Sequence, residues 1–244
     1  MRNIKLTIQY DGTNYYGWQI QPNVVTVQQK VQDAIIKITK EKIKIHGAGR
    51  TDRGVHGLGQ TASFYTNSNI PADKIKFALN SMLPDDIAII DSQDMDKNFH
   101  ARYSAKGKIY KYRIYNNKIR SPIFRNYSYH VPYDINYDKM KKASEYFLGE
   151  HDFIAFMASG SKVKDTFREI YDINFEKRDN IIDITFKGNG FLYNMVRIIV
   201  GTLLDVGKGK IEGKEILHII KSKNRNNAGP TAKPQGLYLK KVLY

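Results

Sequence analysis

The first forty residues change from a two-residue to a helical hydrophobic period. In "IKLTIQY" (4–10), apolar residues alternate with polar ones, which is typical of a strand with one buried face, and Asp11-Gly12 follows as a turn. In "TVQQKVQDAIIKITK" (26–40), apolar residues recur at helical spacing behind Thr26, a suitable N-cap. The pattern therefore predicts a strand followed by a helix.

The same patterns continue to about residue 100. They predict a short strand in "KIKIHGAG" (42–49), a strand in "GQTASFYT" (59–66), a helix from Pro71 at N1 to about Ser81, and a strand in "DIAIIDSQDM" (86–95). Together these elements give the order β-α-β-β-α-β, the ferredoxin-like arrangement. We expect residues 1–104 to form one half of the molecule.

Residues 105–244 are expected to form a second α+β half. The predicted elements are a strand in 106–116, a helix over 137–149 ending at Gly149, strands 168–178 and 180–188 in a hairpin turning at Asp179-Asn180, a helix from about Phe191 to Val206, a short helix from Gly213, and a last strand in 236–244. Residues 121–134, which contain Pro122 and Pro132, are predicted to be an irregular connection, and residues 160–169 a basic loop. The simplest model has a cleft between the halves.

The charge of the chain indicates a polyanionic partner. Its 39 lysines and arginines against 24 acidic residues give a net charge of +15, and basic side chains that neutralise phosphates release bound counterions. The 17 tyrosines could stack on unpaired bases. An alternative remains, because 28 of the basic residues are lysine, and a genome of biased base composition also enriches lysine, isoleucine, asparagine and tyrosine.

Composition also restricts the compartment. The chain has no cysteine, which excludes disulfides and thiolate chemistry and makes the cytoplasm the expected location. The N-terminal residues show no signal-peptide pattern. The longest apolar stretch, "FLYNMVRIIVGTLL" (191–204), is interrupted by Asn194 and Arg197, so we expect a buried helix and no membrane span.

A glycine-rich stretch, "IHGAGRTDRGVHGLGQTASF" (45–64), surrounds a single carboxylate. Asp52 lies between Arg50 and Arg53, and the glycines allow unusual backbone angles or close approach of a ligand. Neighbouring cations favour the ionised form of a carboxylate, which could act as a nucleophile or base. The stretch matches no phosphate-binding motif. Alternatively, Asp52 caps a turn and the arginines face water.

No metal site is expected. His46 and His56 lie on either side of Asp52, but no third ligand follows at a spacing typical of zinc sites. The acidic run "PDDIAIIDSQDMD" (84–96) crosses a turn and a strand without a shared face for magnesium, so a metal-dependent nuclease is disfavoured. The two histidines fit turn or strand-end positions better.

Six blocks of the chain resemble tRNA pseudouridine synthases of the A family. They are "GAGRTDRGVHGLGQTASF" (47–64), "YDGTNYYGWQIQP" (10–22), "FHARYSAKGKIYKYRIYN" (99–116), "HDFIAFMASG" (151–160), "GNGFLYNMVRIIVG" (188–201) and "GPTAKPQGLYL" (229–239). The resemblance implies two halves sharing a central, mostly antiparallel sheet, with helices on one side and the active site in the cleft. It further implies a homodimer that isomerises uridine to pseudouridine at positions 38 to 40 of the tRNA anticodon arm, without a cofactor.

The resemblance also implies roles for individual residues. Asp52 falls on the family's catalytic aspartate, which acts on the ribose side of the glycosidic bond. Whether it adds to the sugar or removes a proton is left open. Arg50 would hold the flipped nucleotide, because the target base must leave its stack. Arg197 would pair with the aspartate, and an arginine in an apolar helix needs a partner.

Two further positions come from the same resemblance. Tyr110 would lie against the uracil as a candidate acid or base, although a tyrosine in a strand is also a common core residue. Leu237 would line the pocket. Lys233 stands where the family usually has proline, which bears on RNA specificity. A non-catalytic RNA-binding protein with the same fold remains the alternative to an enzyme.

Overall fold

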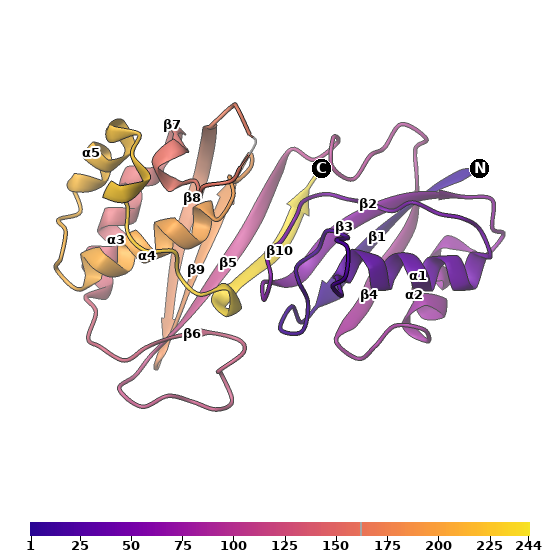
Figure 1. Ribbon diagram of the computed structural model, residues 1–244, viewed down its shortest axis with the longest axis horizontal. Helices are drawn as coiled ribbons and strands as arrows, with labels where there is room; N and C mark the ends of the chain where they lie inside the picture. Colours follow the sequence, from indigo (N-terminus) through magenta and orange to yellow (C-terminus); the bar gives the residue numbers. More distant parts are fainter. Residues whose placement is uncertain (162) are drawn as a thin grey trace. The chain divides into compact units, whose positions relative to one another are not determined.

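The computed structural model describes residues 1–161 and 163–244, which form two compact units (Figure 1). Unit 1 consists of residues 1–106 and 238–244, and unit 2 of residues 107–237. Each unit combines helices with a β-sheet, so the predicted α+β class is confirmed. The predicted basic loop at 160–169 includes Lys162, which lies outside the described residues.

Unit 1 follows the predicted β-α-β-β-α-β order. Its elements are β1 (Arg2–Tyr10), α1 (Val27–Thr39), β2 (His46–Gly47), β3 (His56–Thr66), α2 (Ala72–Asn80) and β4 (Ile87–Met95), joined by β10 (Leu237–Leu243). The strand order is β4-β1-β3-β10, with β2 also paired to β3. β1 is antiparallel to both β3 and β4, so consecutive residues of this central strand face opposite sides of the sheet.

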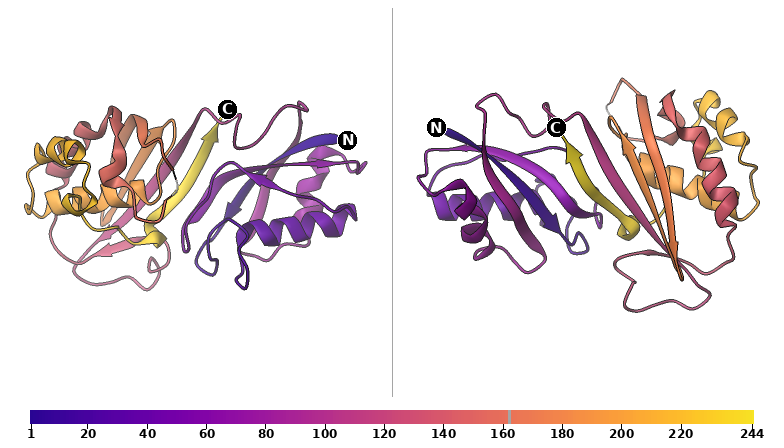
Figure 2. Two further views of the ribbon diagram at one scale, coloured as in Figure 1. Left: turned by 45° about the horizontal axis from the view of Figure 1, so that its top comes forward. Right: turned by 180° about the vertical axis from the view of Figure 1, so that it is seen from behind.

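The core of unit 1 lies between this sheet and its two helices. The alternation in β1 buries Ile4, Leu6 and Ile8 completely. The helical apolar residues meet them in one cluster, to which α1 contributes Val27, Val31 and Ile35 and α2 contributes Ile75 and Leu79. Both helices therefore cover one face of the sheet, as Figure 2 shows.

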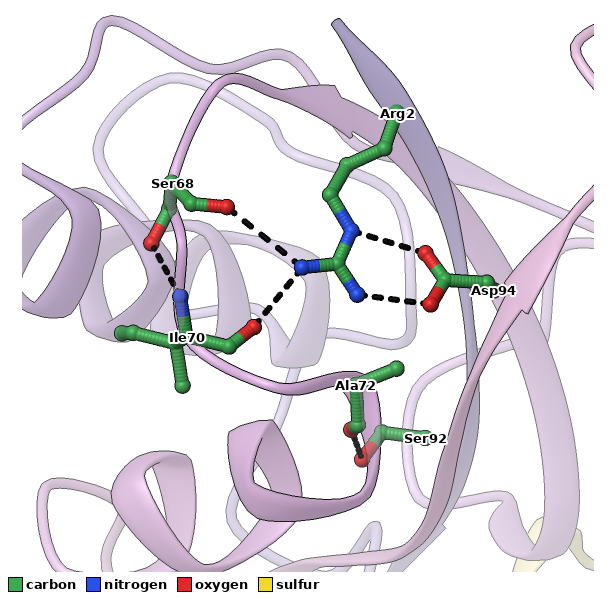
Figure 3. Close-up of polar contacts among 6 residues, drawn as sticks. All are labelled: Arg2, Ser68, Ile70, Ala72, Ser92 and Asp94. Atoms are coloured by element: carbon green, nitrogen blue, oxygen red, sulfur yellow. Dashed lines mark hydrogen bonds and ion pairs between the residues drawn. The ribbon is translucent and has the colours of Figure 1, made fainter.

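Polar contacts fix the edge of unit 1 where β1 begins. The Arg2 guanidinium donates two hydrogen bonds to Asp94 of β4, from Nε to Oδ1 (2.7 Å) and from NH2 to Oδ2 (2.6 Å), as Figure 3 shows. Its NH1 donates to the carbonyl of Ile70 (2.9 Å), and the Ser92 hydroxyl donates to the carbonyl of Ala72 (2.5 Å). One arginine thus connects the first strand with the entry to α2.

Two element ends of unit 1 differ from the prediction. The strand expected over 42–49 is regular only at His46–Gly47, because the following glycine-rich residues leave the ladder. Pro71 is the N-cap of α2 and not its first residue. Thr26 is the N-cap of α1 as predicted, but its side chain makes no capping hydrogen bond.

Unit 2 contains a sheet in the order β5-β9-β8-β7, with β6 paired to β5. Its strands are β5 (Gly107–Asn116), β6 (Tyr129–Val131), β7 (Gly149–Asp152), β8 (Phe167–Arg178) and β9 (Ile181–Gly188). Its helices are α3 (Tyr137–Ser144), α4 (Met195–Gly207) and α5 (Glu215–Ser222), with 3-10 turns at Glu145–Phe147, Phe153–Phe156, Arg225–Asn227 and Pro234–Gly236. The predicted β8–β9 hairpin is confirmed, and Asp179 in its turn has a φ of 51°.

Two helices of unit 2 are shorter than predicted. The helix expected over 137–149 ends at Ser144 and continues as a 3-10 turn, and Gly149 starts β7. The helix expected from about Phe191 begins at Met195 instead. Its N-cap, Asn194, has a φ of 60°, a left-handed conformation that a helix interior cannot contain.

The last strand belongs with unit 1, although the sequence analysis placed it in the C-terminal half. β10 runs parallel to β3, with Tyr238 opposite His56 and Leu239 opposite Gly57. The hydroxyl of Tyr244 donates to the carbonyl of Ala101 (2.7 Å). The chain therefore returns to complete the sheet of unit 1 after forming unit 2.

Among the described residues, no helix combines the length and the apolar character that crossing a membrane would require.

Candidate active site

Asp52 lies in the loop between β2 and β3 of unit 1. Its side chain is half-buried, whereas Arg50 and Arg53 are exposed. A second segment, residues 12–25, crosses this loop and hydrogen-bonds to it. The Trp18 amide donates to the carbonyl of Thr51 (3.0 Å), and the Gly54 amide donates to the carbonyl of Tyr15 (3.3 Å). The backbone is therefore fixed on both sides of Asp52.

Gly17 allows the two segments to touch. Its φ is +85°, and a Cβ atom on it would lie 2.3 Å from the carbonyl oxygen of Thr51 and 3.1 Å from the carbonyl carbon of Asp52. Only glycine combines this backbone angle with this approach. The sequence analysis missed Gly17, although the "YYGWQ" stretch that contains it is part of the resemblance.

Gly47, the last residue of β2 before the Asp52 loop, makes room for a side chain of the 12–25 segment. A Cβ atom on Gly47 would lie 2.3 Å from Nε1 of Trp18, and Trp18 is almost fully buried. The close approach that the sequence predicted therefore occurs, and its partner is the 12–25 segment of the same unit. This close packing restricts the motion of the backbone at the start of the loop.

Buried hydrogen bonds support the loop from the sheet. The hydroxyls of Tyr10 and Thr51 lie 2.8 Å apart, and Nε2 of Gln60 donates to the carbonyl of Gly49 (2.8 Å). Burial raises the pKa of the Tyr10 phenol, so this group stays protonated at neutral pH. The contacts of Tyr10, Thr51 and Gln60 were not predicted, because each joins residues distant along the chain or involves the backbone.

The two histidines beside the loop have other contacts. His56 is buried, its Nδ1 accepts a hydrogen bond from the Gly12 amide (3.1 Å), and its ring stacks on Tyr238 at 4.8 Å. His46 packs against the ring of His100 at 4.9 Å, and burial, with the nearby charges, lowers the pKa of His46. Within the described part of the chain, no three histidine or acidic side chains are placed to hold a metal ion.

Tyr110 and Leu237 are both largely buried in unit 2. Tyr110 lies in β5 opposite Phe186 of β9, is 8% exposed, and makes an edge-to-face contact with Phe191 at 5.2 Å. Leu237, the residue that begins β10, is 6% exposed. The rigid packing of the Tyr110 ring suits a core residue and also a residue that positions a flat ligand.

Arg197 in α4 is half-buried and held by polar partners. Its Nε donates to the carbonyl of Ala232 (2.7 Å), and its NH1 donates to Oδ1 of Asn194 (2.6 Å). The Ala232 amide donates back to the carbonyl of Arg197 (3.1 Å). These groups of unit 2 orient the guanidinium of Arg197. Its predicted pairing with the aspartate stays a prediction.

Within each unit, the structure holds some of the predicted site residues in place. In unit 1, Arg50 and Asp52 share one supported loop. In unit 2, Arg197 is bound to the 229–236 segment, which leads directly to Leu237. Lys233, which directly follows Ala232, accepts another hydrogen bond: the Tyr112 hydroxyl donates to its carbonyl (2.6 Å). Burial raises the pKa of Tyr112.

The comparisons with known proteins assign this α+β chain to a class of RNA-modifying isomerases. A family model described as tRNA pseudouridine synthase matches residues 6–104 and 143–244. The chain belongs to the tRNA pseudouridine synthase family. The predicted fold class and the predicted enzyme class are thereby confirmed.

Two curated relatives show the extent of the similarity. A tRNA pseudouridine synthase A of Thermoanaerobacter sp. (strain X514) is 55% identical over 244 residues, covering 100% of both chains. The tRNA pseudouridine synthase A of Acetivibrio thermocellus is 54% identical over 244 residues, again with full coverage of both. The similarity therefore includes both units.

Solved structures show a weaker similarity. One is the crystal structure of the archaeal box H/ACA sRNP Nop10-Cbf5 complex, with 14% identity, a TM-score of 0.39, and coverage of 82% of this chain and 43% of that chain.

Proposed function

We propose that this protein converts uridine to pseudouridine at positions 38, 39 and 40 of the tRNA anticodon stem-loop. The reaction breaks the bond from the ribose to N1 of uracil, rotates the base and forms a bond to C5, while the C5 proton leaves and N1 gains a proton. Family membership and the names of the relatives support this substrate. The net charge of +15 suits a polyanionic RNA.

The observation that carries the proposal is the support of the Asp52 loop. The backbone on either side of Asp52 is hydrogen-bonded to the 12–25 segment, and Thr51 is bonded to Tyr10 below it. A carboxylate held in this way needs little reorganisation when a ribose is presented to it. We therefore assign the catalytic role to Asp52, acting on the ribose.

The remaining residues are assigned to substrate binding. Arg50 holds the flipped nucleotide, whose base must leave its stack before the reaction. Tyr110 lies against the uracil and is the candidate acid or base for the C5 proton. Arg197 pairs with the catalytic carboxylate, and Leu237 lines the base pocket. The hydrogen bonds that orient Arg197 and the packing of Tyr110 support these roles.

The proposal includes the assembly and the location of the protein. A homodimer of C2 symmetry suits a tRNA, which is far larger than one active site, and tRNA would contact both subunits. No cofactor is needed, because the reaction is an isomerisation. The cytoplasm suits a chain without cysteine that acts on tRNA.

Replacing Asp52 tests the proposal directly. Asp52→Asn should abolish pseudouridine formation in an anticodon-arm transcript and leave RNA affinity within about tenfold, roughly 1.4 kcal/mol. Asp73→Asn is the matched control, because Asp73 is an exposed residue of α2 in the same unit and forms an ion pair with exposed Lys74. The control should retain full turnover. Pseudouridine is measured by chemical labelling and primer extension.

Other outcomes would contradict the assignment. Turnover by Asp52→Asn would remove Asp52 from the catalytic role. Binding of the transcript by the wild-type protein without any pseudouridine would favour a non-catalytic RNA-binding protein instead.

A further inference from the structure

An exposed arginine stacks on an exposed tyrosine directly beside Asp52. The guanidinium carbon of Arg53 lies 4.2 Å from the centroid of the Tyr16 ring. Arg53 is exposed, and Tyr16 is 43% exposed. The proposed reaction assigns no role to either side chain. Arg53 directly follows the candidate catalytic residue in the sequence. A surface cation held on an aromatic ring at this position is suited to bind an anionic ligand.

The backbone around this pair is fixed. The Tyr16 amide donates to the carbonyl of Val25 (3.0 Å), and its own carbonyl accepts from Nε2 of Gln21 (3.0 Å). Gly54, which follows Arg53, is bonded to the carbonyl of Tyr15. The pair therefore lies where the 12–25 segment crosses the Asp52 loop, and its position relative to Asp52 is set by the same contacts.

The stacking leaves the polar edge of the guanidinium for another group. The guanidinium carbon lies over the Tyr16 ring, and this cation–π contact does not require the N–H groups as hydrogen-bond donors. Within residues 1–161 and 163–244, Arg53 forms no ion pair with a carboxylate. Stacked arginine with free N–H groups is suited to bidentate binding of a phosphate.

We propose that Arg53, oriented by Tyr16, binds a backbone phosphate of the substrate RNA adjacent to the target nucleotide. The inference rests on the proposed function, because the ligand is the RNA whose uridine reaches Asp52. Arg53 is the binding group, and Tyr16 is a positioning residue that acts through it. An RNA phosphate fits better than an isolated anion, because the pair is an open surface feature of a chain with a net charge of +15.

Salt-dependent binding of an anticodon-arm transcript tests the contact. Arg53→Ala should weaken binding about 5- to 20-fold at low salt and reduce the slope of log Kd against log salt by about 1, the loss of one phosphate contact. KM should rise by a similar factor, and kcat should change less than about threefold, because the contact exists before and during the reaction. Arg53→Lys should retain most of the slope and recover only part of the affinity.

Tyr16 variants separate positioning from folding. Tyr16→Phe keeps the ring face and should bind as the wild type does, whereas Tyr16→Leu should weaken binding without the change in slope that Arg53→Ala causes. The matched control is Arg102→Ala. Arg102 lies 5.6 Å from the ring of exposed Tyr103 in the same unit, and its loss should change Kd less than twofold.

Each result has a defined meaning. Unchanged affinity and slope in Arg53→Ala, or equal losses in Arg53→Ala and Arg102→Ala, would overturn the inference in favour of diffuse surface charge. Failure of the wild type to form pseudouridine would overturn the proposed function. The binding slopes would still decide whether Arg53 contacts a phosphate, so the two failures are distinguishable.

Discussion

The hydroxyl of Tyr10, at the end of β1, lies 2.8 Å from the hydroxyl of Thr51, the residue before Asp52. Both residues are buried. The contact joins the central strand of unit 1 to the loop that carries the candidate catalytic residue, across 41 positions of sequence. A side chain of the sheet therefore fixes the position of Thr51, the residue next to Asp52.

Tyr10→Phe should reduce both stability and turnover. The substitution leaves the buried Thr51 hydroxyl without this partner, which costs about 1–2 kcal/mol of unfolding free energy. The orientation of Asp52 should loosen, so kcat should fall more than KM changes. Urea unfolding and the rate of pseudouridine formation measure the two effects.

The matched control for that prediction is Tyr244→Phe. It also removes a hydroxyl that donates within unit 1, to the carbonyl of Ala101. This contact involves no residue of the Asp52 loop, so stability should fall and kcat should not. Equal losses of kcat in the two variants would contradict a specific effect on Asp52.

Gly17→Ala should lower the free energy of unfolding more than the same change at another glycine of positive φ. Gly149→Ala isolates the backbone cost, because Gly149 has a φ of +88° and open space around its Cβ position. That cost is about 1–2 kcal/mol. Gly17→Ala adds the collision with the Thr51 carbonyl, so it should destabilise more and also lower kcat. Comparable unfolding midpoints and rates for the two variants would show that the crossing tolerates a methyl group.

The stability of unit 2 should depend on pH through Asp152. Burial raises the pKa of Asp152, but hydrogen bonds from Thr166 and Lys223 and from the Ile154 amide outweigh it, so the net pKa lies below 3.8. A carboxyl whose pKa is lowered by folding stabilises the fold fully above its unfolded pKa and loses this effect as pH falls through the folded pKa.

Asp152→Asn tests this dependence. The difference in unfolding free energy between wild type and variant should be constant near neutral pH and should shrink below about pH 4, where the unfolded carboxyl begins to bind protons. Thr166→Val removes the hydroxyl that donates to Oδ1 of Asp152 (2.6 Å). This variant should also unfold with a lower free energy than the wild type near neutral pH, and the difference should shrink at low pH. Urea unfolding across a pH series measures both, and a difference that is independent of pH would refute the prediction.

Sequence patterns predicted the parts of the molecule that are determined locally. The alternation in β1 and the Asp179-Asn180 turn of the β8–β9 hairpin are properties of short stretches, and both were found. The Asp52 loop was recognised from its own residues. The supports of that loop were not recognised, because the contacts of Tyr10 and Gly17 with it join residues far apart in the chain. The periodic pattern places Tyr10 in β1 but does not show what its hydroxyl contacts.

The errors have the same origin. The start of α4 was placed too early because the apolar run begins before Asn194, whose left-handed conformation delays the helix. The pairing of β10 with β3 was not predicted, because pairing between strands far apart in the chain cannot be seen in either of them. The roles of Tyr110, Arg197 and Leu237 remain predictions.

The late pairing of β10 with β3 has a consequence for biosynthesis. During translation, the strand that flanks β3 emerges only after all of residues 107–237 have been made. A ribosome that stops early therefore releases a polypeptide that carries Asp52 on a sheet with one side still open.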